Sequence, residues 1–272
     1  MNAYPMPTVD FFTVSRYEYE TSAVCDFSDC PRPHFCMGLI LEGTANFTPV
    51  YASRETGAPV TVSRGDIIFV PITSRYISKW TGTPRIRYVS YHFTFAPGTG
   101  ISESNNFTLQ KITPQDFEAL RAVFEYAHAH YGNGLSEQLQ VLSTFYALLS
   151  RLLPSLSHAP ERKYDERIRR AVDYIRLHSE EDISIPTLAT MCNISTSHFY
   201  TKFKEEVGMT PVDYKNSILV SRATTLLLHG DFDSIEAISD ALGFASATYF
   251  RRVFKKITGK SPSEYRKTAA EL

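Results

Sequence analysis

The 272-residue sequence predicts a multidomain α+β protein in which an antiparallel β-barrel with flanking helices precedes an all-α domain. Residues 10–95 contain short runs of aromatic and β-branched residues separated by turn-forming residues, which is typical of antiparallel strands. From about residue 114 onward, apolar residues recur at helical spacing. Residues after 165 also contain an internal repeat, and this repeat predicts two helix-turn-helix units joined by a linker helix.

The composition is that of a folded, water-soluble chain. Apolar residues make up 43% of the sequence and charged residues 21%, which excludes a disordered or collagen-like protein. No run approaches the ~20 apolar residues that cross a bilayer, and the first residues do not resemble a signal peptide. The four cysteines are too few for a disulfide scaffold of this length. We therefore expect a cytoplasmic protein that does not associate with membranes.

The changes in sequence texture predict four segments. These are a β domain over residues 1–110, a helical segment over 111–153, a linker over 154–164 and a helical domain over 165–272. The helical segment carries a wide apolar stripe between Leu135 and Leu153. Two interpretations of this stripe remain open and are compatible, namely packing against the barrel and dimerisation.

The helical domain contains a duplication. The stretch Phe199-Tyr-Thr-Lys-Phe203-Lys204 recurs 51 residues later as Phe250-Arg-Arg-Val-Phe254-Lys255. Each copy predicts a short helix, a turn and a second helix. The turns fall at Asn193 and Gly243, and both residue types tolerate a positive φ. The four phenylalanines of the repeat are expected in the core because of their helical spacing.

A single uninterrupted helix is expected between the two copies, over residues 211–229. At ~1.5 Å per residue this helix is about 28 Å long, close to the ~34 Å between successive major-groove faces of DNA. The spacing therefore predicts a bipartite DNA reader. The second copy also gathers seven basic residues and one acidic residue between Ser246 and Lys267. This excess of positive charge indicates either a phosphate-binding surface or a solvated helix face.

The second copy carries a specific signature, Gly243-Phe244…Tyr249-Phe250…Phe254-Lys255…Gly259…Ser261-Pro262…Tyr265-Arg266. Together with the first copy, it closely resembles the AraC/XylS family of bacterial transcriptional regulators over about residues 165–268. The resemblance implies a seven-helix domain whose two helix-turn-helix units read adjacent major grooves of double-stranded DNA. It also implies a homodimer, a small-molecule effector and activation through contact with RNA polymerase. We therefore expect an effector-responsive, sequence-specific transcriptional regulator.

The resemblance assigns the positions that face the DNA groove. They are Thr196, Ser197, Tyr200 and Thr201 in the first recognition helix, and Ala247, Thr248, Arg251 and Arg252 in the second. Arg252 is the strongest candidate for a base contact, because a guanidinium can bridge O6 and N7 of guanine. Four lysines are expected to hold phosphates or to lie in solvent: Lys202, Lys204, Lys255 and Lys256. Thr201 stands where the family often has arginine, so the first helix is expected to read fewer bases.

In this family, the segment before the DNA reader commonly resembles a cupin-like barrel that binds an effector. Gly65-Asp66-Ile-Ile-Phe-Val-Pro71, preceded by Glu42-Gly43, is similar to the turn and strand motifs of that fold. The candidate effector-binding residues are His34, Glu42, Arg75, Tyr76, Trp80 and His92. By analogy with the family, aromatic and charged groups in a barrel favour a sugar or a small polar metabolite.

The alternative function is a metal-dependent cupin enzyme fused to a DNA-binding tail. Such enzymes need a His-x-His pair, a glutamate and a third histidine, and the barrel region contains no His-x-His. The pair His128 and His130 falls on a predicted helix, where side chains at i and i+2 diverge. The spacings of a second group match no zinc motif: Cys25, Cys30, Cys36 and His34. We therefore expect no catalytic site, metal or cofactor; a helical protein-binding adaptor is a further alternative.

Overall fold

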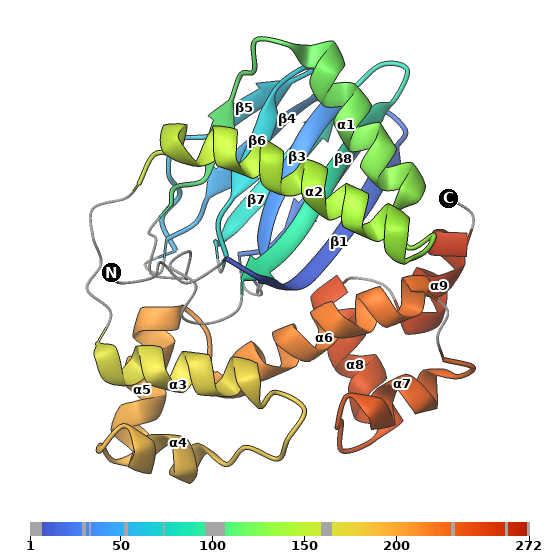
Figure 1. Ribbon diagram of the computed structural model, residues 1–272. Coiled ribbons are helices and arrows are strands. Elements are labelled where there is room, and N and C mark those ends of the chain that lie inside the picture. The colour runs from blue at the N-terminus through green and yellow to red at the C-terminus, as the bar shows by residue number, and fades with distance from the viewer. Residues whose placement is uncertain are drawn as a thin grey trace, which may run out of the picture. The chain divides into compact units, whose positions relative to one another are not determined.

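The computed structural model describes residues 7–28, 31–32, 34–51, 54–72, 74–95, 107–158, 165–229, 232–258 and 261–270. The chain divides into two compact units, Met1–Arg162 and Lys163–Leu272. Strands and two long helices form the first unit, and helices form the second (Figure 1). Within the described residues, none of the helices combines the length and apolar character needed to cross a membrane.

The strands of the first unit form two antiparallel sheets, which together we call the barrel (Figure 1). The five-stranded sheet has the order β1-β8-β3-β6-β9, and the four-stranded sheet has the order β2-β7-β4-β5. The strand bounds are β1 Val9–Tyr19, β2 Ser22–Asp26, β3 Phe35–Glu42, β4 Thr44–Pro49, β5 Val60–Ser63, β6 Ile67–Val70, β7 Tyr76–Thr81, β8 Ile86–Phe95 and β9 Gln110–Ile112. These sheets confirm the predicted antiparallel β domain.

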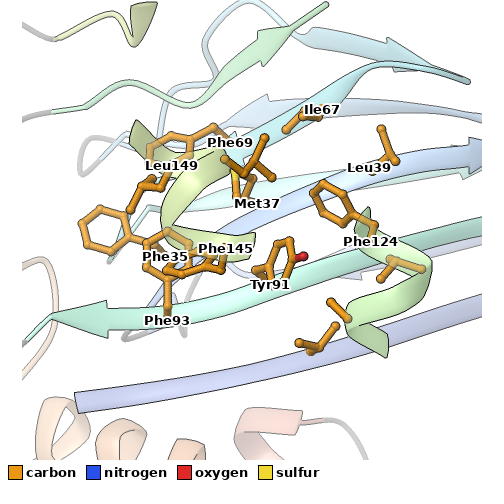
Figure 2. Close-up of a cluster of buried hydrophobic side chains, with 14 of the residues drawn as sticks. Phe35, Met37, Leu39, Ile67, Phe69, Tyr91, Phe93, Phe124, Phe145 and Leu149 are labelled. Atoms are coloured by element: carbon orange, nitrogen blue, oxygen red, sulfur yellow. The ribbon is translucent and has the colours of Figure 1, made fainter. Parts of the chain in front are cut away.

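Alternation along the strands gives the five-stranded sheet two apolar faces. On β3, Met37 and Leu39 point to one face, and Cys36 and Ile40 point to the other. The face with Met37 is covered by helices, and Figure 2 shows its cluster of buried rings around Tyr91. The face with Ile40 packs against the four-stranded sheet. A second apolar core therefore fills the space between the sheets.

Helices α1 (Phe117–His130) and α2 (Leu135–Leu152) cover the outer face of the five-stranded sheet (Figure 1). The predicted start of α1 is capped by Asp116, whose carboxylate accepts a hydrogen bond from the backbone N–H of Ala119 at 3.0 Å. Phe124 and Phe145 are completely buried, with ring centres 4.6 and 5.3 Å from that of Tyr91 (Figure 2). Much of the apolar stripe therefore packs against the barrel.

The end of α2 continues into the first unit. A 3-10 turn, η1 (Leu153–Ser155), is followed by Leu156, which is buried in the core beneath the helices. His158 then pairs with Phe107 in an isolated antiparallel bridge. Residues 154–158 were expected to belong to the linker but are part of the barrel unit. The reason is that the apolar side chain of Leu156 is buried in the core between the helices and the five-stranded sheet. Residues 159–164 lie outside the described residues.

The second unit contains seven described helices (Figure 1). Their bounds are α3 Glu166–Leu177, α4 Ile185–Met191, α5 Thr196–Val207, α6 Pro211–His229, α7 Ile235–Ala241, α8 Ala247–Thr258 and α9 Pro262–Ala270. The long helix α6 matches the predicted span. It contributes Tyr214 to the core built around α5, and Leu219 and Leu227 to the core built around α8. The two halves of this unit therefore share one helix.

Candidate nucleic-acid interface and barrel cluster

Helices α4 and α5 form the first helix-turn-helix, which we call the first reader. Asn193 in the turn has a φ of 54°, the left-handed conformation expected from the sequence. The hydroxyl of Ser195 then caps α5 by accepting a hydrogen bond from the backbone N–H of His198 at 3.3 Å. Phe199 and Phe203 are completely buried, which confirms their predicted place in the core.

Helices α7 and α8 form the second helix-turn-helix, or second reader. Gly243 in its turn has a φ of 68°, and a methyl group there would overlap the carbonyl oxygen of Glu180. Ser246 caps α8 by accepting a hydrogen bond from the backbone N–H of Tyr249 at 3.2 Å. Phe250 and Phe254 are completely buried, as predicted. Glycine is therefore required both by the backbone angle and by the close approach.

The groove-facing positions expected from the resemblance lie mostly on the surface of the two recognition helices. All four on α5 are exposed: Thr196, Ser197, Tyr200 and Thr201. On α8, Thr248, Arg251 and Arg252 are exposed and Ala247 is half-buried. Both sets begin at the first residue of a recognition helix. The repeat therefore presents two equivalent surfaces, one with hydroxyl groups and one with guanidinium groups.

Arg252 is oriented by residues that sequence reasoning missed. Its guanidinium carbon lies 5.3 Å from the centre of the Tyr249 ring, within the range of a cation–π contact. The hydroxyl of Tyr249 in turn accepts a hydrogen bond from the side-chain amide of Asn216 on α6, at 2.8 Å. Asn216 is 9% exposed. The position of Arg252 on the second reader is thus tied to the shared helix α6.

Several of the cations expected at the DNA interface are paired with acids. Arg251 pairs with Glu236 on α7, and the ammonium nitrogen of Lys256 lies 3.3 Å from a carboxylate oxygen of Asp213. The backbone N–H of Glu236 and the Arg251 guanidinium lower the pKa of that carboxyl. Among the residues that the structure describes, no acidic side chain pairs with Arg252 or Lys255.

Lys202 lies away from the exposed hydroxyl surface of α5. Its ammonium nitrogen is 3.1 Å from a carboxylate oxygen of Asp165 and 3.4 Å from one of Glu206. Hydrogen bonds to these two acids raise the pKa of Lys202, and hydrogen bonds from Arg167 and Lys202 lower the pKa of Asp165. Because Asp165 also caps α3, the contact of Lys202 joins α5 to the start of that helix.

The candidate effector residues divide into two groups in the barrel. Tyr76, Trp80 and His92 are buried between the two sheets, and Trp80 stacks on Tyr88 with ring centres 4.3 Å apart. Glu42 lies at the other end of β3 from His34. There its carboxylate oxygens are 3.2 Å from a nitrogen of Arg85 and 2.8 Å from one of Arg87.

Two of the candidate histidines meet in a polar cluster between the sheets. Nδ1 of His92 lies 3.1 Å from Nε2 of His34 and 3.4 Å from a guanidinium nitrogen of Arg32. Nε2 of His92 lies 2.8 Å from the Ser90 hydroxyl and 3.4 Å from that of Tyr17. Burial lowers the pKa of both histidines well below the ordinary value. Sequence reasoning missed Tyr17, which the pairing of β1 with β8 brings near His92, and Arg32, which lies in the segment before β3.

Arg75 makes a contact outside this cluster. Its guanidinium donates a hydrogen bond to the backbone carbonyl of Ser28. Tyr76, the next residue, instead packs its ring between the sheets, with its centre 5.0 Å from that of Phe27. Burial raises the pKa of the Tyr76 hydroxyl well above its usual range, so the hydroxyl is neutral at physiological pH.

The structure gives no support to a metal site within the described part of the chain. No three histidine, cysteine, aspartate or glutamate side chains come together there as a metal would require. Cys25, Cys36 and Cys192 are free thiols. Burial raises the pKa of the Cys36 thiol to about 11, so this group is protonated at neutral pH. Cys30 lies outside the described residues.

Comparison with a family model finds similarity in the helical unit. A model of a helix-turn-helix domain matches residues 188–268. The arabinose operon regulatory protein of Escherichia coli (strain K12) is 30% identical over 140 residues, which cover 51% of this chain and 48% of that protein. The MmsAB operon regulatory protein of Pseudomonas aeruginosa is 34% identical over 93 residues, which cover 34% of this chain and 30% of that protein. The chain thus spans about half or less of these curated relatives.

Comparison with solved structures extends the likeness to both units. The crystal structure of ToxT from Vibrio cholerae O395 has a TM-score of 0.65 and 16% identity, and the match covers 96% of this chain and 99% of that one. ToxT bound to an unsaturated fatty acid, from strain SCE256, has a TM-score of 0.62 and 14% identity, and the match covers 94% and 95%. At such low identity the likeness shows the fold. It confirms the predicted fold class, a β domain with flanking helices before an all-α domain.

Proposed function

We propose that the chain is a sequence-specific transcriptional regulator of the AraC/XylS family whose barrel binds a small-molecule effector. The match of residues 188–268 to a model of a helix-turn-helix domain supports this proposal. The observation that carries this proposal is the repeated reader, with an exposed recognition surface on α5 and on α8. Two of the matched relatives are named as operon regulatory proteins. We assign no reaction to the chain.

In this proposal, the second reader provides most of the attraction to DNA. Arg252 is unpaired with acids in the described residues and is held against Tyr249, so its guanidinium is available for the O6 and N7 atoms of guanine. Lys255 is exposed on the same helix and suits a phosphate contact. Arg251 and Lys256 must exchange their acidic partners for phosphates, which reduces their net contribution.

The first reader then contributes mainly through neutral groups. Thr196, Ser197 and Thr201 offer hydroxyl groups, and Tyr200 offers a 41%-exposed ring and hydroxyl. Such groups contact thymine methyl groups or accept and donate single hydrogen bonds, and they discriminate less than a bidentate guanidinium. We infer that the operator half-site read by α8 is more strictly specified than the half-site read by α5.

The barrel is proposed as the sensor. One crystal structure of ToxT contains a bound unsaturated fatty acid, and another contains (E)-4-(8-methylnaphthalen-1-yl)but-3-enoic acid. In this chain the corresponding proposal rests on the polar cluster around His92, which sits among buried rings between the sheets. Effector binding is proposed to change the dimer geometry or the contacts between the units, and so the engagement of two half-sites.

The remaining partners follow from this role. We propose that the protein acts in the cytoplasm as a homodimer and contacts RNA polymerase when it activates transcription. Leu135 and Leu139 on α2 support a dimer, because these large apolar side chains are 78% and 57% exposed. Two apolar side chains one helical turn apart fit a helix-to-helix contact between two copies.

Selection of genomic fragments by the full chain across a salt series tests the regulator. Specific binding should weaken linearly in a plot of log affinity against log salt concentration.

Arg252→Ala should lower affinity for the selected site by about 1–3 kcal/mol and relax the base preference at one position. Arg169→Ala is the matched control, because Arg169 is an exposed arginine on α3 that pairs with Glu166. Equal selection by wild type and Arg252→Ala would contradict the assigned role.

A further inference from the structure

Arg252 rests on an aromatic ring of its own helix. It is exposed on α8, and its guanidinium carbon lies 5.3 Å from the centre of the Tyr249 ring. The two residues are three positions apart, so their side chains share one face of the helix. A long exposed side chain has many accessible rotamers, and contact with a flat ring reduces their number. The direction of the guanidinium therefore depends on where the ring of Tyr249 lies.

Packing alone does not hold that ring. Tyr249 is half-buried, whereas its neighbour Phe250 is completely buried. Tyr249 also lines a pocket of about 200 Å³ between α6, the loop before α4 and the turn at Gly243. A side chain beside an open pocket keeps freedom of movement that close packing removes. The ring therefore needs a specific contact to keep one direction.

Asn216 on α6 makes this contact. Its side-chain amide donates a hydrogen bond of 2.8 Å to the Tyr249 hydroxyl. Asn216 is 9% exposed, and a hydrogen bond that is shielded from water is costly to leave unmade. The bond fixes the far end of the ring, while the backbone of α8 fixes the near end. The surface under Arg252 is thus set by a residue of the shared helix.

The first reader has different residues at the corresponding positions. The offset of 51 residues between the copies aligns Tyr249 with His198 and Arg252 with Thr201. Both residues of the first copy are exposed on α5. Threonine has no guanidinium that a ring could orient, so this arrangement belongs to the second reader. His198 accordingly offers a matched control position.

We propose that Asn216 is a positioning residue for base recognition, and that it sets the base preference of the second reader through Tyr249 and Arg252. This inference rests on the proposed role of the chain as a DNA-binding regulator, and it adds a buried residue to the recognition surface. A bidentate contact to guanine needs both N–H groups in line with O6 and N7. A guanidinium that turns away still attracts phosphates but no longer distinguishes the base. Loss of the Asn216 amide should therefore reduce specificity more than affinity.

Binding of selected genomic fragments by the full chain tests this proposal. The first step identifies the base pair at which Arg252→Ala relaxes the preference of the wild type. At this base pair, Asn216→Ala should lower the ratio of affinities for the preferred and the other bases by about threefold or more, out of roughly 5–150-fold for a complete bidentate contact. Affinity for a fragment without the site should change less than about twofold, because Asn216→Ala leaves the charge of the protein unchanged.

A double-mutant cycle distinguishes positioning from an independent effect. Asn216→Ala should change the base preference of the wild type but not that of Arg252→Ala, because the amide acts through the arginine. Tyr249→Phe keeps the ring and removes only the hydroxyl, so it should relax the preference at the same base pair as Asn216→Ala does. His198→Ala is the matched control, and it should leave the preference at that base pair unchanged.

A merely structural role of Asn216 gives a different result. Asn216→Ala would then melt at a lower temperature and bind every fragment more weakly, with an unchanged base preference. That outcome, an additive effect in the cycle, or an unchanged preference in Tyr249→Phe would overturn the proposal. Tyr249→Phe decides the question alone if Asn216→Ala does not fold, because it removes a single hydroxyl.

The same measurements separate this proposal from the proposed function. A wild type that selects no DNA fragments would overturn the regulator and this inference together. A wild type that selects fragments, with a base preference that depends on Arg252 but not on Asn216 or the Tyr249 hydroxyl, would overturn only this inference.

Discussion

Arg251 and Arg252 are neighbours in the sequence, yet their guanidinium groups have different partners. Arg251 pairs with Glu236 on the preceding helix, whereas Arg252 rests against the ring of Tyr249. An exposed ion pair of this kind contributes little to stability. In the proposed complex with DNA the pair has a larger effect, because Glu236 places a negative charge beside the surface that is proposed to face phosphates. We therefore expect the two arginines to contribute differently to DNA binding, although their side chains are chemically identical.

The paired histidines make stability depend on pH. Burial and the charge of Arg32 hold the pKa of His34 below about 6.5, and burial, His34 and Arg32 do the same for His92. Below that pH these two histidines are protonated in the unfolded chain but remain neutral in the folded chain until their lowered pKa values are reached. The free energy of unfolding should therefore fall as pH decreases from 7 to 5.5, by up to about 1.4 kcal/mol per pH unit for each histidine. Denaturant unfolding of the full chain at several pH values measures this.

Variants identify the source of that slope. His92→Asn should make the free energy of unfolding depend less steeply on pH, because one of the two histidines with a lowered pKa is removed. His198→Asn removes an exposed histidine from α5 and should leave the slope unchanged. Half-buried His128 also has a pKa lowered by desolvation, so a residual slope of the same sign is expected in His92→Asn. A wild-type stability that rises between pH 7 and 5.5 would show that the buried pair is protonated in the folded protein.

At the scale of elements, the turn of the second reader is fixed by its contact with the segment after α3. Gly243 adopts a left-handed φ and approaches the carbonyl of Glu180 closely. Arg222 on α6 pairs with the carboxylate of Glu180 at 2.6 Å, and Lys215 on α6 contacts the backbone carbonyl of Glu181 at 2.5 Å. The loop before α4 is thus held by both α6 and the turn at Gly243, which joins the two readers.

Gly243→Ala should destabilise the helical unit by about 2–4 kcal/mol, since both the backbone angle and the overlap with Glu180 oppose a methyl group. Gly65→Ala separates these causes. Gly65 also has a left-handed φ, of 93°, but a methyl group there would meet the Phe117 ring only at 3.6 Å. It should cost about 1 kcal/mol. Equal losses in chemical unfolding would mean that the approach of Glu180 adds nothing.

Helix ends were the elements most accessible from sequence, because capping is local. Thr210 caps the start of α6, where the Asp213 N–H donates to the Thr210 hydroxyl at 3.1 Å. Ser261 and Glu264 form a capping box at the start of α9. The duplication likewise predicted both readers, because a pattern of residues that occurs in both copies is unlikely to arise by chance.

The barrel cluster was less accessible, because strand register decides which residues meet. His92 lies opposite Thr13 on β1 and Cys36 on β3, and these pairings place it beside groups from distant parts of the chain. Alternation alone shows which strand positions share a face, but not which strands are adjacent. Histidine and tryptophan were therefore recognisable as candidates, while Arg32 was not, and Glu42 was grouped with residues at the other end of its strand.

At the scale of the whole molecule, the exposed residues of α2 bear on assembly. Leu135 and Leu139 continue the stripe whose other members pack on the barrel, and they are largely exposed. Replacing both with glutamate should convert the proposed dimer into a monomer, because each leucine loses about 1.5–3 kcal/mol of apolar burial at the contact. Sedimentation equilibrium of the full chain measures the mass.

The control for assembly is Leu177→Glu, which alters a 64%-exposed leucine at the end of α3 and should leave the mass unchanged. The double variant of Leu135 and Leu139 should bind a fragment with one half-site as tightly as the wild type does. Binding to a fragment with two half-sites should weaken, because the second contact is no longer intramolecular. A wild type that is monomeric at all concentrations, or a double variant that stays dimeric, would exclude this face of α2.

Helix α6 has a consequence for how such a protein diverges over time. The cores of both readers include side chains of this one helix, with Tyr214 in the first and Leu219 and Leu227 in the second. One inserted residue would advance the second reader by about 1.5 Å and swing it around the axis by about 100°. We therefore expect insertions in α6 to be tolerated only when they add close to a full helical turn. The spacing between the two half-sites should then change in steps of that size during evolution.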